Sequence, residues 1–376
     1  MLLRRLMCCL AVPAMLLCVA QANAEAGIGA DEVLLGMVNA QTGPASALGQ
    51  EMRDGALAYF SRINAAGGVY GRRLSLAVRD DGYEPSRTAR QTRELIDSRG
   101  VFALFGYVGT PTSRAALPLA QGAGVPYLFA LSGAQVLRTP VHHWVFTLRA
   151  SYQAETELLA GYMTEDLQLD RVALLMQDDS FGETVKSGLA GALGKRGRTL
   201  QGEAHFLRNS LDLGEAVRQL QPARPQAIFF IGTYKQLAAA VREARALGMP
   251  ARFFSVSFVG TRSFIAEAGA DAEGVYISQV VPSPDDASLP LVRDYQKDMR
   301  GPLGHDSLEG YIGAAVLVEA LRRSGPQPTR GQLVEALESL DLNLGGLHIR
   351  FGPDDHQGMD ALYLTRIEQG RAVPVR

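Results

Sequence analysis

The chain has 376 residues, of which 47% are hydrophobic and 20% charged, and its 37 basic and 39 acidic side chains leave a formal net charge of −2. This balance is typical of a folded globular protein and excludes a disordered chain, which would have fewer apolar residues and a larger net charge. A nucleic-acid-binding protein is excluded as well, because no long run of Lys and Arg provides a positive surface.

The first 24 residues predict a cleaved secretory signal peptide. Arg4 and Arg5 precede an almost wholly apolar stretch, 6–20, and a small-x-small cleavage site at 22–24. About 15 apolar residues are too few to span a membrane, which takes roughly 20. All three cysteines lie in this segment, and Leu17 before Cys18 is too bulky for a lipoprotein attachment site. We therefore expect a periplasmic protein whose mature chain has no thiol for catalysis, metal binding or disulfides.

From residue 33 onward, short apolar runs alternate with amphipathic helical patterns. In the first series, strands are expected at 33–38, 74–78, 102–105 and 126–129, with helices at 52–63, 85–96 and 111–120. In the second series, strands are expected at 172–176, 199–206, 227–231 and 253–255, with helices near 153–166, 184–193, 212–221 and 234–247. Such alternation predicts parallel sheets covered by helices on both faces.

The final part of the chain breaks the alternation. Three helices are expected at 289–299, 308–321 and 332–340, followed by two strands at 347–351 and 362–367. If the helices pack on the first lobe and the strands on the second, the chain crosses between lobes three times. The predicted fold is therefore α/β, with two doubly wound Rossmann-like lobes joined by a three-crossing hinge. The expected lobes are residues 25–149 plus 282–342 (N-terminal) and residues 150–281 plus 343–376 (C-terminal).

Motifs of enzymes and metal sites are missing. The sequence has no phosphate-binding loop, no dinucleotide fingerprint after a strand, no His-Glu-x-x-His and no Gly-x-Ser-x-Gly. His142 and His143 would point to opposite faces of a strand, so we interpret them as part of a polar loop. The segment 354–358 is interpreted as a turn, because no Glu follows where a calcium loop requires one. We expect a protein that is not an enzyme and that needs no cofactor or metal.

Polar residues follow two strands of the first lobe, where open α/β sheets bind ligands. Thr110, after the strand 102–105, is expected to cap a helix that begins at Pro111, so that the positive helix end faces the crevice and can receive an anion. Ser132 and Gly133, after the next strand, offer a hydroxyl and bare backbone. The competing interpretation is that Thr110 only caps its helix.

Short motifs occur in a fixed order along the mature chain: QTGP at 41–44 with LG at 48–49, INAAGGVYG at 63–71, DDGYEP at 80–85, DDSFG at 178–182 and ARALG at 244–248. In this order they resemble the branched-chain amino-acid-binding family of periplasmic solute-binding proteins, which serve ATP-driven importers and have the type I periplasmic-binding fold. The resemblance implies two lobes joined by three strands, a ligand in the cleft between them, and hinge closure without covalent chemistry.

The resemblance also implies candidate ligand contacts. In the first lobe, Thr110 falls where the family uses a hydroxyl for the ligand carboxylate, and Ser132 and Gly133 fall where a second hydroxyl and backbone amides assist. The remaining candidates are aromatic: Phe181 at a wall position of the facing lobe, Tyr234 (or Thr233 in a register shifted by one) at another, and Tyr107 and Tyr152. For each aromatic residue, a place in the core is the competing interpretation.

The chain departs from the family at the acids. Ser257 stands where amino-acid binders have the acid that holds the ligand ammonium, and Leu48 replaces a first-lobe tyrosine. A second acidic position falls near Ala154, which is not acidic, although Glu155 is next to it. We therefore hypothesise that an aromatic or aliphatic carboxylate, or an amide, fits better than an amino acid.

Arg149, near the first crossing, has two interpretations. It could bind the ligand carboxylate through two parallel hydrogen bonds, or it could pair with an acid and stiffen the hinge, which we favour. The partners implied by the resemblance are a small solute and the membrane permease of an ABC importer. A periplasmic sensor protein is the alternative partner, because the same fold serves receptors.

Overall fold

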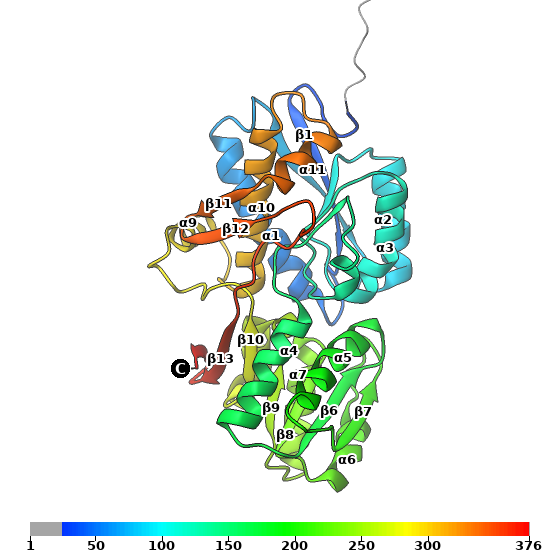
Figure 1. Ribbon diagram of the computed structural model, residues 1–376, viewed down its shortest axis with the longest axis vertical. Helices are drawn as coiled ribbons and strands as arrows, with labels where there is room; N and C mark the ends of the chain where they lie inside the picture. Colours follow the sequence, from blue (N-terminus) through cyan, green and yellow to red (C-terminus); the bar gives the residue numbers. More distant parts are fainter. Residues whose placement is uncertain (1–24, 376) are drawn as a thin grey trace, which may run out of the picture.

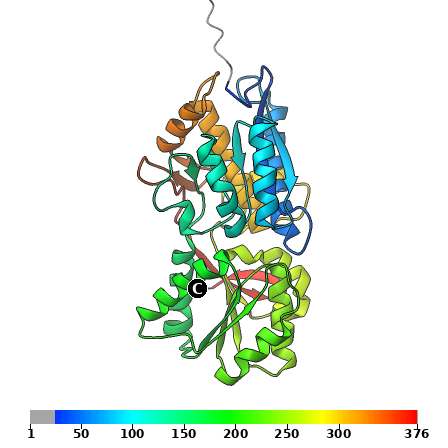
Figure 2. The same cartoon turned by 90° about the vertical axis from the view of Figure 1, so that its right-hand side faces the viewer.

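Two sheets covered by helices organise the chain into two lobes (Figures 1 and 2). The computed structural model describes residues 25–375, so the predicted signal peptide, 1–24, lies outside the described residues. The central strands Val172–Gln177 and Ala227–Ile231 are buried at every position, as expected for strands covered on both faces. The predicted fold, α/β with two doubly wound lobes, is confirmed.

The first lobe contains five parallel strands in the order β2-β1-β3-β4-β5. The strands are β1 Glu32–Asn39, β2 Arg73–Asp80, β3 Ala103–Phe105, β4 Tyr127–Leu128 and β5 Val145–Phe146. The helices are α1 Ser46–Ala65, α2 Pro85–Asp97, α3 Thr110–Gly122 and, from the tail, α9 Pro290–Asp298, α10 His305–Arg323 and α11 Arg330–Glu338. A short 3-10 turn, Gln135–Leu137, follows β4.

The tail helices join the first lobe because α1 and α10 pack closely together. Glycines permit this approach: a Cβ on Gly55 would lie 1.8 Å from the Ser307 carbonyl oxygen, and a Cβ on Gly310 would lie 2.3 Å from the Met52 carbonyl oxygen. Any side chain at either position would push the helices apart.

The second lobe contains seven strands in the order β14-β13-β10-β9-β8-β6-β7. The strands are β6 Val172–Gln177, β7 Gly202–Phe206, β8 Ala227–Ile231, β9 Arg252–Ser255, β10 Tyr276–Gln279, β13 Tyr363–Glu368 and β14 Arg371–Pro374, the last two antiparallel. The helices are α4 Tyr152–Gly161 with a π-helical turn Tyr162–Asp166, α5 Ser180–Gly194, α6 Gly214–Leu220, α7 Tyr234–Ala246 and α8 Thr261–Ala268. The 3-10 turns are Gln221–Ala223, Ser257–Val259 and Gly269–Ala272.

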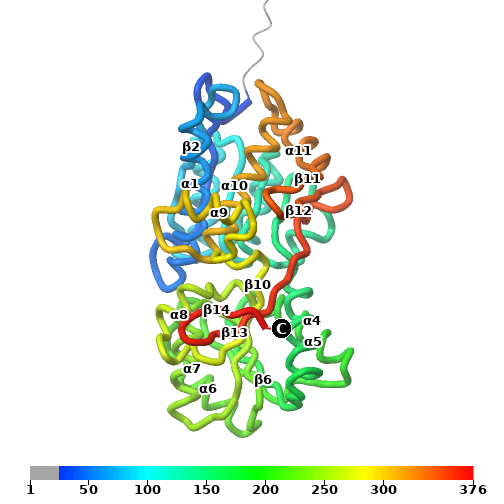
Figure 3. The backbone as a smooth tube through the Cα atoms, turned by 90° about the vertical axis from the view of Figure 1, so that its left-hand side faces the viewer, coloured from blue at the N-terminus to red at the C-terminus, as the bar shows by residue number. Residues whose placement is uncertain are grey.

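The third crossing begins later than the sequence indicates. The tail forms a hairpin of β11 Asp341–Leu344 and β12 Leu347–Arg350 beside the first lobe, and only then descends to β13 (Figures 1 and 3). Phe351 contacts Phe129 and Phe146, with ring centroids 6.2 and 5.5 Å apart, and the Thr147 carbonyl accepts a hydrogen bond from Gly358 N at 2.9 Å. The expected boundary at residue 343 is therefore corrected: apolar side chains hold the hairpin to the first lobe, and we propose to assign residues through Met359 to it.

Candidate functional site

The N-terminal end of α3 carries a pair of buried hydroxyls. The helix begins at Thr110 itself, with Gly109 as its cap residue, so the expectation that Thr110 caps the helix is corrected. The Thr110 hydroxyl instead lies 2.9 Å from the Ser132 hydroxyl, and both side chains are fully buried. Gly109 has φ +98°, and a Cβ there would lie 2.3 Å from Tyr83 Cε2. The glycine thus lets Tyr83 approach the helix end, where free amides favour an anion.

Gly133 joins the first-lobe loop to the start of the second lobe. Its carbonyl accepts a hydrogen bond from Tyr152 N at 2.8 Å, and a Cβ on Gly133 would lie 2.7 Å from that nitrogen and 2.6 Å from the Tyr152 ring. Ser151 caps α4 by accepting a hydrogen bond from Ala154 N. The first crossing therefore enters the second lobe directly beside the Thr110–Ser132 pair.

Four aromatic rings connect the lobes beside this pair. Tyr152 and Phe181 of the second lobe have ring centroids 5.4 Å apart, and Phe181 and Phe258 are 4.6 Å apart. Tyr83 of the first lobe lies 6.1 Å from Phe258, so the contact crosses between lobes. The Asp179 carboxylate caps α5 by accepting a hydrogen bond from Phe181 N, which fixes the Phe181 ring at the start of the helix. Helices α3 and α5 also touch across the lobes.

Tyr234 lies at the interface, and Thr233 has another role. Thr233 forms a capping box with Gln236 at the start of α7, so its hydroxyl serves its own helix. The Tyr234 hydroxyl accepts a weak hydrogen bond from Ala47 N of the first lobe at 3.4 Å. Of the two registers considered, the structure favours Tyr234 as the residue that faces the first lobe.

Ser257 marks a buried carboxylate that the sequence analysis did not select. Ser257 N donates a hydrogen bond to Glu155 Oε2 at 2.7 Å, and the Ser278 hydroxyl donates to the same oxygen at 2.6 Å. Burial raises the pKa of Glu155, and the nearby Arg149 cation opposes this effect. Glu155 is three residues after Tyr152 on α4, so the helical period places both side chains on one face. This three-residue spacing is the feature of the sequence that could have identified Glu155 as a neighbour of Tyr152.

Tyr107 does not belong to this set. Its hydroxyl lies 2.9 Å from the Thr92 hydroxyl and its ring centroid 4.9 Å from that of Tyr127, within the apolar core beneath α2 and α3. Strand alternation would align Tyr107 with Phe105, but Gly106 has φ +66° and interrupts it. The prediction of Tyr107 as a ligand contact is corrected: the competing core interpretation holds.

Arg149 pairs with Glu309 of α10. Its Nε lies 2.9 and 3.2 Å from the two carboxylate oxygens and its Nη2 lies 2.8 Å from Oε2, with the side chains 1% and 2% exposed. Burial alone would lower the pKa of Arg149, but the Glu309 carboxylate outweighs it and the pKa is raised. The ion pair ties the first crossing to the first lobe, which supports the stiffening role.

Polar contacts also join the lobes at two further places. On one side, Glu51 Oε1 of α1 accepts hydrogen bonds from Arg262 Nη2 at 2.8 Å and from the Ser263 hydroxyl at 2.7 Å. On the other, Asn209 Nδ2 donates to the Gly82 carbonyl at 3.1 Å and to the Glu84 carboxylate at 2.8 Å. The described arrangement is therefore one in which the lobes touch on several sides.

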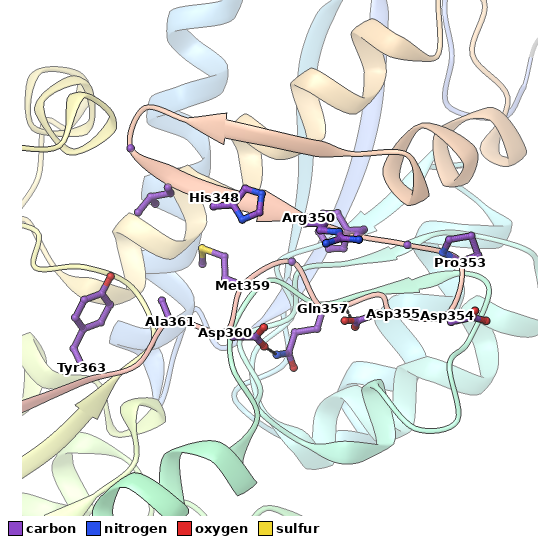
Figure 4. Close-up of a pocket in the computed structure, with 15 residues that line it drawn as sticks. His348, Arg350, Pro353, Asp354, Asp355, Gln357, Met359, Asp360, Ala361 and Tyr363 are labelled. Atoms are coloured by element: carbon purple, nitrogen blue, oxygen red, sulfur yellow. Dashed lines mark hydrogen bonds between the residues drawn. The ribbon is translucent and has the colours of Figure 1, made fainter.

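A separate surface cavity of about 760 Å³ lies along β12 and the third crossing (Figure 4). Asp354, Asp355 and Asp360 line it, and Gln357 donates a hydrogen bond to Asp360. Within residues 25–375, no group of three or more His, Cys, Asp or Glu side chains is arranged to hold a metal ion. None of the helices in that range is long and apolar enough to cross a membrane. The cavity shares no residue with the interlobe contacts described above.

The chain is similar in sequence and in fold to known proteins. A family model described as "Periplasmic binding protein" matches residues 32–372. A leucine-, isoleucine-, valine-, threonine- and alanine-binding protein from Pseudomonas aeruginosa is 21% identical over 80% of this chain and 81% of its own length. The solved structure of a "possible leucine/isoleucine/valine-binding protein" from Rhodopirellula baltica is 33% identical, covers 92% of this chain and 97% of that one, and has a TM-score of 0.87. A fatty acid ABC transporter substrate-binding protein from Thermomonospora curvata, 21% identical over 94% and 93% of the chains, shares the fold with a TM-score of 0.84.

Proposed function

Because this chain belongs to the periplasmic binding protein family, we propose that it captures a small solute with a carboxylate or amide group between its lobes and delivers it to the permease of an ABC importer. It is a solute-binding protein of a transport system, and its family does not consist of enzymes. The observation that carries the proposed ligand chemistry is the buried Thr110–Ser132 hydroxyl pair at the start of α3, opposite the second lobe.

The proposed contacts come from both lobes. Thr110, Ser132 and Gly133 receive an oxygen of the ligand through hydroxyls and the helix end. The second lobe contributes the remaining members of the set: Tyr152, Phe181, Tyr234 and Ser257. Arg149 is left out of this set, because Glu309 already occupies its Nε and Nη2.

The range of ligands named for the relatives supports a broad choice of solute. The relative from Pseudomonas aeruginosa is named for five amino acids, and the neighbour from Thermomonospora curvata for fatty acids. Both kinds of ligand carry a carboxylate, which is the group that the hydroxyl pair suits. The family relationship also supports a periplasmic location, and we propose that residues 1–24 direct the export.

Closure of the lobes on a ligand follows two-state linkage. A ligand that touches both lobes favours the closed arrangement only by its difference in affinity for the two states. To shift the ratio of closed to open protein from 1:99 to 99:1, the ligand must bind the closed state more favourably by roughly 5.5 kcal/mol. A few hydrogen bonds to a charged group can supply this difference, because each contributes about 1.5–3 kcal/mol. The polar groups at the interface are sufficient for this purpose.

A thermal-shift screen of the mature protein tests the proposal. Carboxylates, amides, amino acids and nucleobases are compared, hits are measured by calorimetry, and closure is followed by small-angle scattering. We expect a carboxylate or amide to raise the unfolding temperature and to reduce the radius of gyration. If no compound stabilises the protein and the scattering profile stays unchanged, the proposal is wrong.

A further inference from the structure

Two carboxyl groups of the first lobe are buried by contact with the second lobe. Glu51 of α1 and Asp306 of α10 are 6% and 4% exposed. Gly260, which precedes α8 of the second lobe, covers Asp306, because a Cβ on this glycine would lie 3.4 Å from Asp306 Oδ2. Glu51 Oε1 accepts the hydrogen bonds from Arg262 and Ser263 of the same helix. Opening of the lobes would therefore expose both carboxyl groups to water.

The two carboxyl groups also lie close to each other. Helices α1 and α10 pack together, and a side chain on Gly304, two residues before Asp306, would overlap Glu51 Oε2. Among residues 25–375, no group donates a hydrogen bond to Glu51 Oε2. Two ionised carboxylates that are buried near one another repel, and one proton on the pair removes the repulsion.

The buried cluster around Asp306 has one more acid than it has cations. The charged groups that act on Asp306 are the carboxylates of Glu51 and Glu309 and the guanidinium groups of Arg149 and Arg262. Arg149 is paired with Glu309, and Arg262 is paired with Glu51. Asp306 is therefore left without a cation of its own, and one negative charge of the cluster is not balanced.

The other titratable groups nearby do not balance this charge. Glu155 and Arg138 lie next along the cluster and carry opposite charges. Desolvation lowers the pKa of His305, at the start of α10, to about 4, so its ring is neutral at neutral pH. Burial raises the pKa of Tyr295 of α9 to about 12, so its hydroxyl is neutral as well. The amides at the start of α10 favour an anion, but they do so whether the lobes are open or closed.

Contact between the lobes makes the charged form of Asp306 costly. Burial, together with the Glu51 and Glu309 carboxylates, raises the pKa of Asp306 well above its usual range, and Arg149 and Arg262 oppose this effect. When the lobes separate, water reaches the carboxyl group and its pKa returns toward the usual value of about 4. A group whose pKa is higher in the closed state than in the open state takes up a proton on closure.

We propose that Glu51 and Asp306 form a proton-binding site that lobe closure completes, so that solute binding takes up a proton and becomes tighter as the pH falls. The inference goes beyond the proposed function and rests on the lobe closure that it includes. The gain in affinity is fully present below the pKa of Asp306 in the open state. It is lost as the pH rises toward the pKa in the closed state, by up to about tenfold for each pH unit.

Calorimetry at three pH values tests the inference. The probes are L-leucine, 4-methylpentanoate and 4-methylpentanamide, none of which changes its charge appreciably between about pH 6 and 8. Titrations in phosphate and in Tris buffer, which differ in ionisation enthalpy, give the number of protons taken up. The variant Asp306→Asn keeps the shape of the side chain and removes its charge. The control is Asp294→Asn in the same lobe, because the Asp294 carboxylate pairs with Arg62 at the surface. Urea unfolding without solute checks that both variants fold.

We expect the affinity of the parent and of Asp294→Asn to fall at least about tenfold between pH 6 and 8, with close to one proton taken up for each solute bound. Asp306→Asn should bind at least about tenfold more tightly than the parent at pH 8 and should depend little on pH. If the parent binds equally well at each pH, or if Asp306→Asn keeps the pH dependence of the parent, the inference is wrong while the proposed function stands.

Small-angle scattering of the solute-free protein separates the two proposals if none of the three probes binds. The ligand chemistry proposed above then fails, and the radius of gyration decides the inference. Because the proton favours the closed state, the radius of the parent should decrease from about pH 8 to 6, and that of Asp306→Asn should be smaller and constant. An unchanged radius of the parent would overturn the inference.

Discussion

Removal of the Arg149 guanidinium should destabilise the protein strongly. Arg149→Met leaves the Glu309 carboxylate, 2% exposed, without the cation that contacts both of its oxygens at 2.8–3.2 Å. Breaking a buried ion pair by removing one partner costs about 3–5 kcal/mol, because an uncompensated charge remains in the interior. We therefore expect urea unfolding, followed by circular dichroism, to give a free energy of unfolding lower by about 3–5 kcal/mol.

The double variant Arg149→Met/Glu309→Leu provides the control. Replacing both members of a buried pair with apolar residues is often neutral or stabilising, so most of the lost free energy of unfolding should return. The alternative role of Arg149, a ligand contact, requires a different result. If the single variant loses less than about 1 kcal/mol, the usual worth of an exposed pair, and ligand affinity falls sharply, the structural interpretation is refuted.

Three further substitutions test the interface. Thr110→Val removes the hydroxyl and keeps the shape, so ligand affinity in calorimetry should fall about tenfold or more. The free energy of unfolding should fall by about 1–3 kcal/mol, because the buried Ser132 hydroxyl loses its partner. Unchanged affinity would contradict the site. Gly133→Ala places a methyl 2.7 Å from Tyr152 N and should lower both the unfolding temperature and the affinity, and a variant like the parent would argue against a fixed crossing. Arg262→Ala removes the partly exposed ion pair with Glu51, which joins the two lobes. Ligand binding should weaken by about fivefold or less, and small-angle scattering should show a larger radius of gyration because the lobes separate more easily. A smaller radius of gyration would contradict this expectation.

Hydropathy patterns were sufficient to predict most of the long elements, but not the two-residue strand β5 or the lobe to which the tail hairpin belongs. Helix α7 was predicted to within one residue, because it combines a clear helical period with a marked end, and β6 and β8 nearly to the residue, because each is a short uninterrupted apolar run. Strand β5, with two residues, is too short to show a period. Most of the hairpin of β11 and β12, from residue 343 onward, was assigned to the other lobe, because the contacts of Phe351 that hold it come from residues distant in the sequence.

Only part of the candidate site was predicted, because some of its contacts also join residues that are distant in the sequence. Thr110, Ser132 and Gly133 follow strand ends, and the rule for open α/β sheets applies to them directly. Tyr107 follows the same strand, yet the left-handed Gly106 turns it toward the core. Glu155 was named only as the neighbour of Ala154, because its contacts with Ser257 and Ser278 form only in the folded second lobe.

The C-terminal part of the chain completes both lobes. The first sheet is covered by α10, and the second sheet is completed by β13 and β14 from the end of the chain. A nascent chain that lacks these segments would leave the apolar face of α1 uncovered and β10 as an open sheet edge. Neither lobe can therefore complete its sheet and cover its core until nearly all of the chain has been synthesised, so the last segments to leave the ribosome give both lobes their final stability.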